Sequence, residues 1–97
     1  MPMYNPPHPG EFITNIYLEP NGISGRELAE KLDVAASTLS RILNGNSRVT
    51  PEMALRLAEA LGRSAESWLA MQNAHDLWLA RRTVSLRGVA KLKLATA

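Results

Sequence analysis

Apolar residues recur along most of the chain with the spacing of one face of an α-helix. The first such segment can begin at Pro9 in a first helical turn, and Pro20 closes it. Four more segments follow before residue 83, and no strand-type alternation competes with them there. The pattern predicts an all-α fold with five helices, over about residues 9–20, 25–32, 36–44 and 51–61 and from 65 through at least 79.

Polar caps mark where three of these helices begin. Ser24, with Glu27 three residues later, forms a capping box ahead of the second helix. Thr50 precedes Pro51 at the start of the fourth helix, and Ser64 precedes the fifth. These signals place the boundaries independently of the apolar spacing.

The second and third helices are separated by a short break that begins at Asp33, the arrangement of a helix-turn-helix over about residues 25–44. Two helices that cross steeply need a small residue where they touch, and Ala29 occupies that position. The turn needs a residue that tolerates positive φ, usually glycine, and aspartate does so at modest cost. Leu39 and Ile42 are expected to hold the third helix against the core.

The outward face of the third helix carries the candidate DNA contacts. At 100° per residue, with Ala36 at 0°, Ser40 lies at about 40° and Arg41 at about 140°, whereas the aliphatic side chains lie between about 240° and 340°. Small residues permit close approach to the major groove, arginine can contact guanine with two hydrogen bonds, and serine or asparagine can contact bases or phosphates. Helix N-termini favour phosphates, and a loop arginine can reach a phosphate or the minor groove. The candidate DNA-binding residues are Ser24, Ala36, Ser37, Thr38, Ser40, Arg41, Asn44 and Arg48. By spacing alone, the alternative is a plain helical bundle whose third helix has a solvated polar face.

The charge is distributed unevenly along the 97 residues. Through Asp76 there are six basic and nine acidic residues, a net −3, and after it five basic residues and no acid, a net +5. Any electrostatic contact with nucleic acid must therefore be local to one face, with or without help from the tail. The sequence predicts a flexible N-terminal arm over residues 1–7, a DNA-binding domain over 8–82 and a basic tail over 83–97.

No enzyme, cofactor or metal site is expected. The chain has no cysteine, and its two histidines are far apart in the sequence. His8 with Glu11, or His75 with Asp76, lacks a third partner at useful spacing, and His75 lies on an apolar arc where a packed interface residue is the favoured interpretation. With no signal peptide and no apolar run of bilayer length, the expected location is the cytoplasm, with no membrane partner.

The fifth helix is apolar over more than one stripe, and this surplus predicts a homodimer. The predicted interface residues are Leu69, Leu77, Trp78 and Leu79. A tail that folds back over the same surface is the alternative. The tail alternates with period two at residues 84–86 and 91–94, which indicates a short extended segment. Such a basic end is more often solvated than a DNA-binding arm.

The segment LAEKLDVAASTLSRILNG, residues 28–45, resembles the helix-turn-helix of the Xre/Cro-repressor family. Together with HPGEFI, LNGNSRVTPEMALRLAEALG and SAESWLAMQNAHDLW, it makes residues 8–80 similar to HigA-type, or VapI-like, antitoxins. The resemblance implies a five-helix lambda-repressor-like domain that acts as a homodimeric, operator-binding repressor. It also implies that the protein neutralises a HigB-type toxin, an mRNA-cleaving ribonuclease of the RelE fold. A stand-alone Xre-family regulator without a toxin is the alternative. Many relatives have glycine at Asp33 and a polar residue at Ala36, so base contacts are expected to depend more on Ser37, Ser40 and Arg41.

Overall fold

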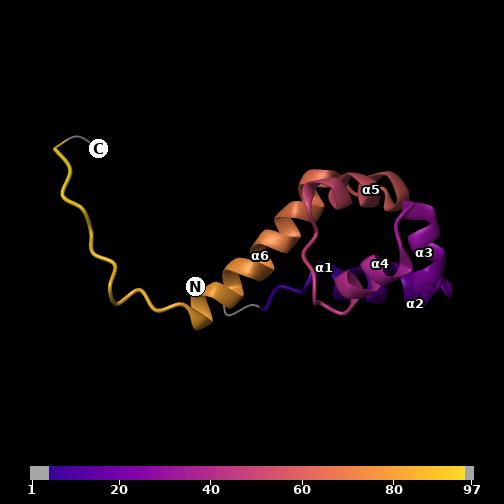
Figure 1. The fold of residues 1–97 in the computed structure, drawn as a ribbon, viewed down its shortest axis with the longest axis horizontal. Helices are drawn as coiled ribbons and strands as arrows, with labels where there is room; N and C mark the ends of the chain where they lie inside the picture. Colours follow the sequence, from indigo (N-terminus) through magenta and orange to yellow (C-terminus); the bar gives the residue numbers. More distant parts are fainter. Residues whose placement is uncertain (1–4, 96–97) are drawn as a thin grey trace.

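The structure is a computed structural model that describes residues 5–95. Its described part is all-helical, with five helical segments as the sequence predicts and no strand. The helices α1 to α5 and the first half of α6 form a body, and the second half of α6 leads away from it (Figure 1). None of the helices in residues 5–95 is long and apolar enough to cross a membrane.

The first segment runs through α1 (Pro9–Ile13), a π-helical turn (Thr14–Leu18) and α2 (Glu19–Asn21). The expectation that Pro20 closes this segment is wrong, because Pro20 lies inside α2 and the chain turns at Gly22, with φ 63°. The amide of Glu19 bonds to the carbonyl of Thr14, five residues back, which is the wider π-type pattern. Proline supplies no amide hydrogen, so it fits a stretch in which the regular ladder is already interrupted.

The helix-turn-helix consists of α3 (Gly25–Leu32) and α4 (Ala36–Leu43), and the predicted boundaries are confirmed within one residue. Ser24 caps α3 by accepting a hydrogen bond from the amide of Glu27 at 3.1 Å. Asp33 adopts φ 58°, the left-handed conformation that the turn requires. Aspartate therefore takes the place of the usual glycine.

The remaining helices are α5 (Pro51–Leu61) and α6 (Ala65–Thr83), capped by the Thr50 and Ser64 hydroxyls as predicted. Trp68 from α6 is fully buried and packs against the rings of Phe12 and Tyr17. The buried apolar core comprises Ile13, Leu18, Leu28, Ala29, Leu32, Leu39, Ile42, Val49, Met53, Ala54, Leu57 and Trp68. All five segments or the loops between them contribute, so the core fixes α4 from several sides.

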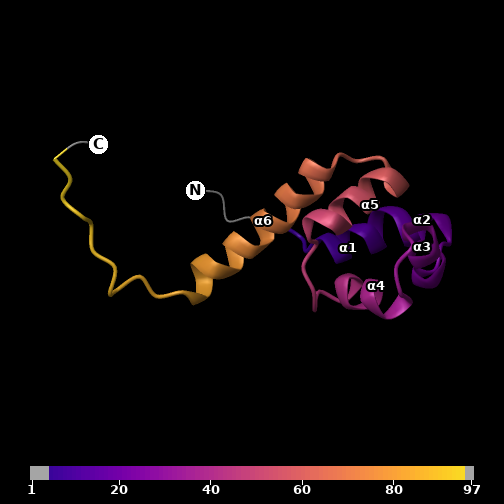
Figure 2. The same cartoon turned by 45° about the horizontal axis from the view of Figure 1, so that its top comes forward.

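Only Trp68 and Gln72 are buried on α6, so the helix beyond residue 72 projects from the body. Both views show this half of α6 and the extended tail leading away from the other helices (Figures 1 and 2). Residues 84–95 are exposed and form neither helix nor strand, with one turn in which the Val89 amide bonds to the Leu86 carbonyl. Pro6 is buried and its carbonyl oxygen lies 2.9 Å from His75 Nδ1, so part of the predicted N-terminal arm packs beside α6.

Candidate nucleic-acid interface

The outward face of α4 presents small polar residues and one arginine. Ala36, Ser37, Ser40, Arg41 and Asn44 are exposed, and Thr38 is half-buried. On the opposite side Leu39 and Ile42 are 1% and 3% exposed, as the helical arithmetic predicts. Asn44 Nδ2 donates to Ser40 Oγ at 3.3 Å. Within residues 5–95 no hydrogen bond or ion pair engages the Arg41 side chain, so the arginine can reach out from the surface.

The position of α4 is set by a close approach of α1 at Gly10. A Cβ atom built on Gly10 would lie 1.9 Å from the carbonyl oxygen of Ile42. Only glycine lets the two backbones meet at this distance. His8 caps α1 through Nδ1, which accepts from the Gly10 amide at 2.9 Å. The apolar pattern gave no sign of this contact, and the glycine within the HPGEFI segment is the only trace of it in the sequence.

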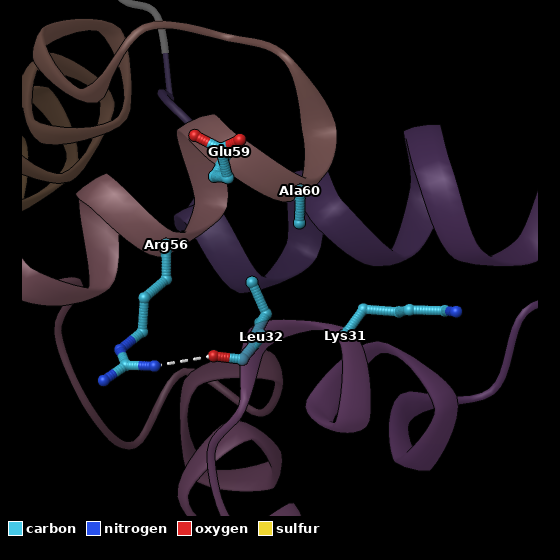
Figure 3. A pocket seen from close by; sticks show the side chains of 5 residues that line it. All are labelled: Lys31, Leu32, Arg56, Glu59 and Ala60. Atoms are coloured by element: carbon cyan, nitrogen blue, oxygen red, sulfur yellow. Dashed lines mark hydrogen bonds between the residues drawn. The ribbon is translucent and has the colours of Figure 1, made fainter.

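The turn of the helix-turn-helix is braced by Arg56 of α5. Its Nη1 donates to the carbonyl oxygen of Leu32 at 2.8 Å and to that of Asp33 at 3.2 Å. Glu52, one turn earlier on α5, pairs with the same guanidinium at 2.9 Å. Figure 3 shows Arg56 reaching from α5 to the end of α3, while Lys31 points away. The carbonyls that end α3 therefore have a fixed partner, and sequence spacing could not assign it.

Besides Ser40 and Asn44, which bond to each other, two further predicted DNA contacts have partners inside the chain. The Ser24 hydroxyl is exposed but already serves as the cap of α3. Arg48 lies in the loop after α4, with its side chain 63% exposed, and it forms an ion pair with Asp76 of α6. Arg48 Nε donates to Asp76 Oδ2 at 2.9 Å, and Nη2 donates to the same oxygen. Its guanidinium is thus directed to α6 rather than outward.

The same loop is attached to α6 by a buried glutamine. Gln72 is 2% exposed, and its Oε1 accepts a hydrogen bond from the Val49 amide at 2.7 Å. Its Nε2 donates to Asp76 Oδ1 at 2.9 Å. Burial raises the pKa of Asp76, but hydrogen bonds from Arg48 and Gln72 outweigh it and hold the pKa below its usual value. Gln72 carries no signal in the sequence, because a polar residue on a helix is normally expected to face solvent.

The structure brings His8 and His75 together, although they are far apart in the sequence. Their ring centroids are 5.2 Å apart in an edge-to-face arrangement. Partial burial and the neighbouring His75 lower the pKa of His8. His75 is half-buried, and across residues 5–95 no cluster of three or more histidine, aspartate or glutamate side chains could hold a metal ion.

The four predicted interface residues do not share one environment. Leu69 is half-buried and packs against the core of the body. Leu77 and Leu79 are 48% and 42% exposed on the projecting half of α6. Trp78 is half-buried, with the Arg82 guanidinium 4.8 Å from its ring centroid. The free apolar surface of α6 is therefore concentrated beyond the body.

The helix-turn-helix family model matches residues 16–68, which include α3, α4 and α5. An uncharacterized HTH-type transcriptional regulator of Escherichia coli K12, YddM, is 41% identical over 95% of this chain and 97% of its own length. Antitoxin HigA-1 of Vibrio cholerae is 44% identical over 71% of this chain and 65% of its own length.

Solved structures with the same fold include a HigA-family addiction module antidote protein from Coxiella burnetii. It has a TM-score of 0.84 and 29% identity, over 93% of this chain and 100% of its own. Antitoxin HigA of Pseudomonas aeruginosa, solved with the higBA promoter, has a TM-score of 0.81 and 28% identity, over 92% of this chain and 99% of its own.

Proposed function

This chain belongs to the Xre-type helix-turn-helix family, in the group that includes HigA antitoxins, and we propose that it is a sequence-specific repressor that reads DNA with α4. The observation that carries the proposal is the two-sided character of this helix. Ser37, Ser40 and Arg41 face solvent together, while Leu39 and Ile42 are buried. The family consists of DNA-binding regulators and antitoxins rather than enzymes.

The recognition step follows from the size and chemistry of the α4 face. Ala36 and Ser37 at the start of the helix are small enough for close approach to the floor of the major groove. Arg41, one turn further on, can donate two hydrogen bonds to a guanine edge. Ser40 and Asn44 supply shorter polar contacts to bases or phosphates.

We infer that the operator-binding form is a homodimer joined through the projecting half of α6. Leu77 and Leu79 are exposed there, close to the half-buried Trp78. Two recognition helices related by a two-fold axis, about 34 Å apart, would enter successive major grooves on one side of a palindrome. Replacing Leu77 and Trp78 with charged residues should therefore give monomers that bind the operator weakly.

The HigA names of several relatives support a second role, as an antitoxin that neutralises a HigB-type toxin and represses its own operon. The similarity to YddM along nearly its whole length supports the alternative of a stand-alone transcription regulator. The two roles are distinguished by co-expressing this chain with any toxin-sized reading frame adjacent to its gene. An antitoxin restores growth of cells that express the toxin, whereas a stand-alone regulator has no neighbouring toxin gene.

The variant that tests DNA reading is the double substitution Arg41→Ala and Ser40→Ala. Both side chains are exposed, so the thermal midpoint should be retained. A bidentate arginine contact is worth about 1–3 kcal/mol of base discrimination, and a dimer loses it twice. Operator affinity should fall at least about tenfold while weak non-specific binding remains. Unchanged affinity in the folded variant, measured by fluorescence anisotropy, would exclude α4 as the reading helix. The variant should still neutralise a toxin, provided that the DNA and toxin surfaces are separate.

A further inference from the structure

We propose that Gln72 and Asp76 are positioning residues for DNA recognition. They join the loop that follows α4 to the helix that projects from the body, and they thereby fix the distance and rotation between the two recognition helices of a dimer. This inference rests on the proposed function. It assigns a role to three side chains, Arg48, Gln72 and Asp76, which we call the α6 bracket.

The bracket is a continuous chain of hydrogen bonds that runs from the buried backbone of the loop to the exposed side chain of Arg48. Its inner end is the Val49 amide, which donates to Gln72 Oε1 at 2.7 Å in a fully buried setting. Gln72 Nε2 then donates to Asp76 Oδ1 at 2.9 Å, and Asp76 Oδ2 accepts from Arg48 at the surface. Arg48 and Val49 are consecutive, so α6 holds the loop through its backbone and through a side chain at once.

The bracket lies where α6 leaves the body. Gln72 is the last buried residue of the helix, and Asp76 lies one turn further along, on the projecting half. The loop over residues 44–50 begins directly after α4. A tilt of α6 as a whole relative to α4 would have to break the bonds that Gln72 and Asp76 make with the loop. Because the Val49 amide is buried, losing its acceptor would leave an unsatisfied donor, which opposes such a tilt.

The groups around the bracket belong to the N-terminal segment, to α6 and to the loop after α4. His8 packs edge-on against His75, and the His75 ring nitrogen lies 2.9 Å from the Pro6 carbonyl oxygen. With Gly45, Asn46 and Ser47 these rings line a small hollow of about 130 Å³ beside Arg48 and Asp76. The N-terminal segment therefore packs beside the joint.

A rigid connection between α4 and α6 matters because the two recognition helices of a dimer must match the spacing of the two DNA half-sites closely. One base pair changes the separation of two half-sites by about 3.4 Å and their relative rotation by about 36°. A dimer connected through α6 can reject the wrong spacing only when α4 cannot move relative to α6. The bracket supplies this stiffness, and in doing so it engages Arg48 with Asp76 instead of with a phosphate.

The experiment uses the full chain and a palindrome that the wild-type protein selects from random-sequence DNA. Affinity is measured for the selected spacing, for spacings one base pair shorter and longer, and for a single half-site. The variants are Gln72→Met, which keeps the volume, and the milder Asp76→Asn. The control is Asn73→Ala, at the neighbouring exposed position of α6. Dimerisation is followed by sedimentation and the Val49 amide by hydrogen exchange.

We expect the spacing preference of both bracket variants to be about threefold to tenfold lower than that of wild type, which lies within the range by which mutations change couplings between distant sites. Their half-site affinity and dimerisation should match those of wild type, and Asn73→Ala should change nothing. A faster-exchanging Val49 amide with the full spacing preference would overturn the proposal, because the bracket would then be structural only. Tighter binding by Asp76→Asn with a steeper salt dependence would also overturn it, since Arg48 would then act on phosphate. A wild-type protein that selects no site would refute the proposed function itself, before any variant is compared.

Discussion

Gly10 is the residue at which the approach of α1 to α4 can be tested most directly. In Gly10→Ala the added Cβ would lie 1.9 Å from a backbone oxygen, which cannot move aside like the end of a side chain. Overpacking of this kind costs about 1–3 kcal/mol, and the backbone contact places Gly10 at or above the upper end. The thermal midpoint should fall by more than about 10 °C.

Gly88→Ala is the matched control, because nothing lies within 4 Å of the Cβ built at that exposed position. Its thermal midpoint should equal that of wild type. Equal midpoints for Gly10→Ala and wild type would mean that α1 and α4 are not in backbone contact.

His8 should make the stability depend on pH. Burial and the neighbouring His75 lower its folded-state pKa below the unfolded value of about 6.5. Between these two values the unfolded chain binds a proton that the folded chain excludes, so stability rises with pH. His8 therefore contributes its full stability above about pH 6.5, and this is lost as the pH falls through the folded-state pKa.

The variant His8→Asn keeps an acceptor suited to an N-cap but removes the titration. At about pH 7.5 it should unfold near the wild-type temperature, and on acidification to about pH 5.5 it should lose less stability than wild type. NMR titration of the His8 ring, with Glu11, His75 and Asp76 as the charged neighbours, assigns the effect. An equal acid loss in both proteins would place the responsible group elsewhere.

At the residue scale, the sequence predicted what depends on near neighbours. The capping hydroxyls of Ser24, Thr50 and Ser64 and the left-handed Asp33 all follow from residue types within a few positions of a helix end. The Arg48–Asp76 pair spans 28 residues, and no local rule selects one carboxylate among nine. Partner choice at that distance is decided by the tertiary packing.

At the scale of elements, the buried and exposed faces of α4 were predicted well because an amphipathic helix has one regular period. The first segment was predicted less well, since Pro20 is a reliable helix breaker only where the regular hydrogen-bond ladder runs through it. The preceding π-helical turn removes that condition. The apolar spacing does not distinguish a π-helical turn from a regular one, so it could not show this interruption.

The brace between α5 and the turn can be tested with Arg56→Met, which keeps the aliphatic stem. The variant removes the donors to the Leu32 and Asp33 carbonyls, so the free energy of unfolding should fall by about 1–2 kcal/mol. Glu52→Gln is the control, because an exposed pair one turn apart contributes only about 0.3–0.5 kcal/mol. Urea unfolding measures both. A larger loss in Glu52→Gln than in Arg56→Met would assign the stabilisation to the ion pair instead.

At the scale of the whole molecule, the chain divides into an acidic body and a basic projecting end. The charge balance and the surplus apolar surface of α6 were visible in the sequence, but the distribution of that surface was not. Leu69 belongs to the body, whereas Leu77 and Leu79 lie on the projecting half of α6. Helical spacing places these residues on one helix, and the packing of α6 against α5, the first helical segment and the loop before α5 determines where burial stops.

The tail continues this exposed surface, and we expect it to contribute to dimerisation more than to DNA binding. Val84 and Leu86 before the turn, and Leu92 and Leu94 after it, are all at least 57% exposed, and the two-residue spacing within each pair puts its side chains on one side of an extended stretch. Truncation after Thr83, where α6 ends, should raise the dimer dissociation constant at least about tenfold, since burying each such side chain can contribute more than about 1 kcal/mol. The slope of log affinity against log salt should hardly change when DNA binding is measured at protein concentrations above the dimer dissociation constant.

Substituting Arg87, Lys91 and Lys93 with glutamine in the full chain separates the effect of charge from that of apolar surface, and this variant should still form the dimer. If the tail is instead a DNA arm, both variants will flatten the salt slope by about 0.9 for each lost phosphate contact while the dimer is unaffected.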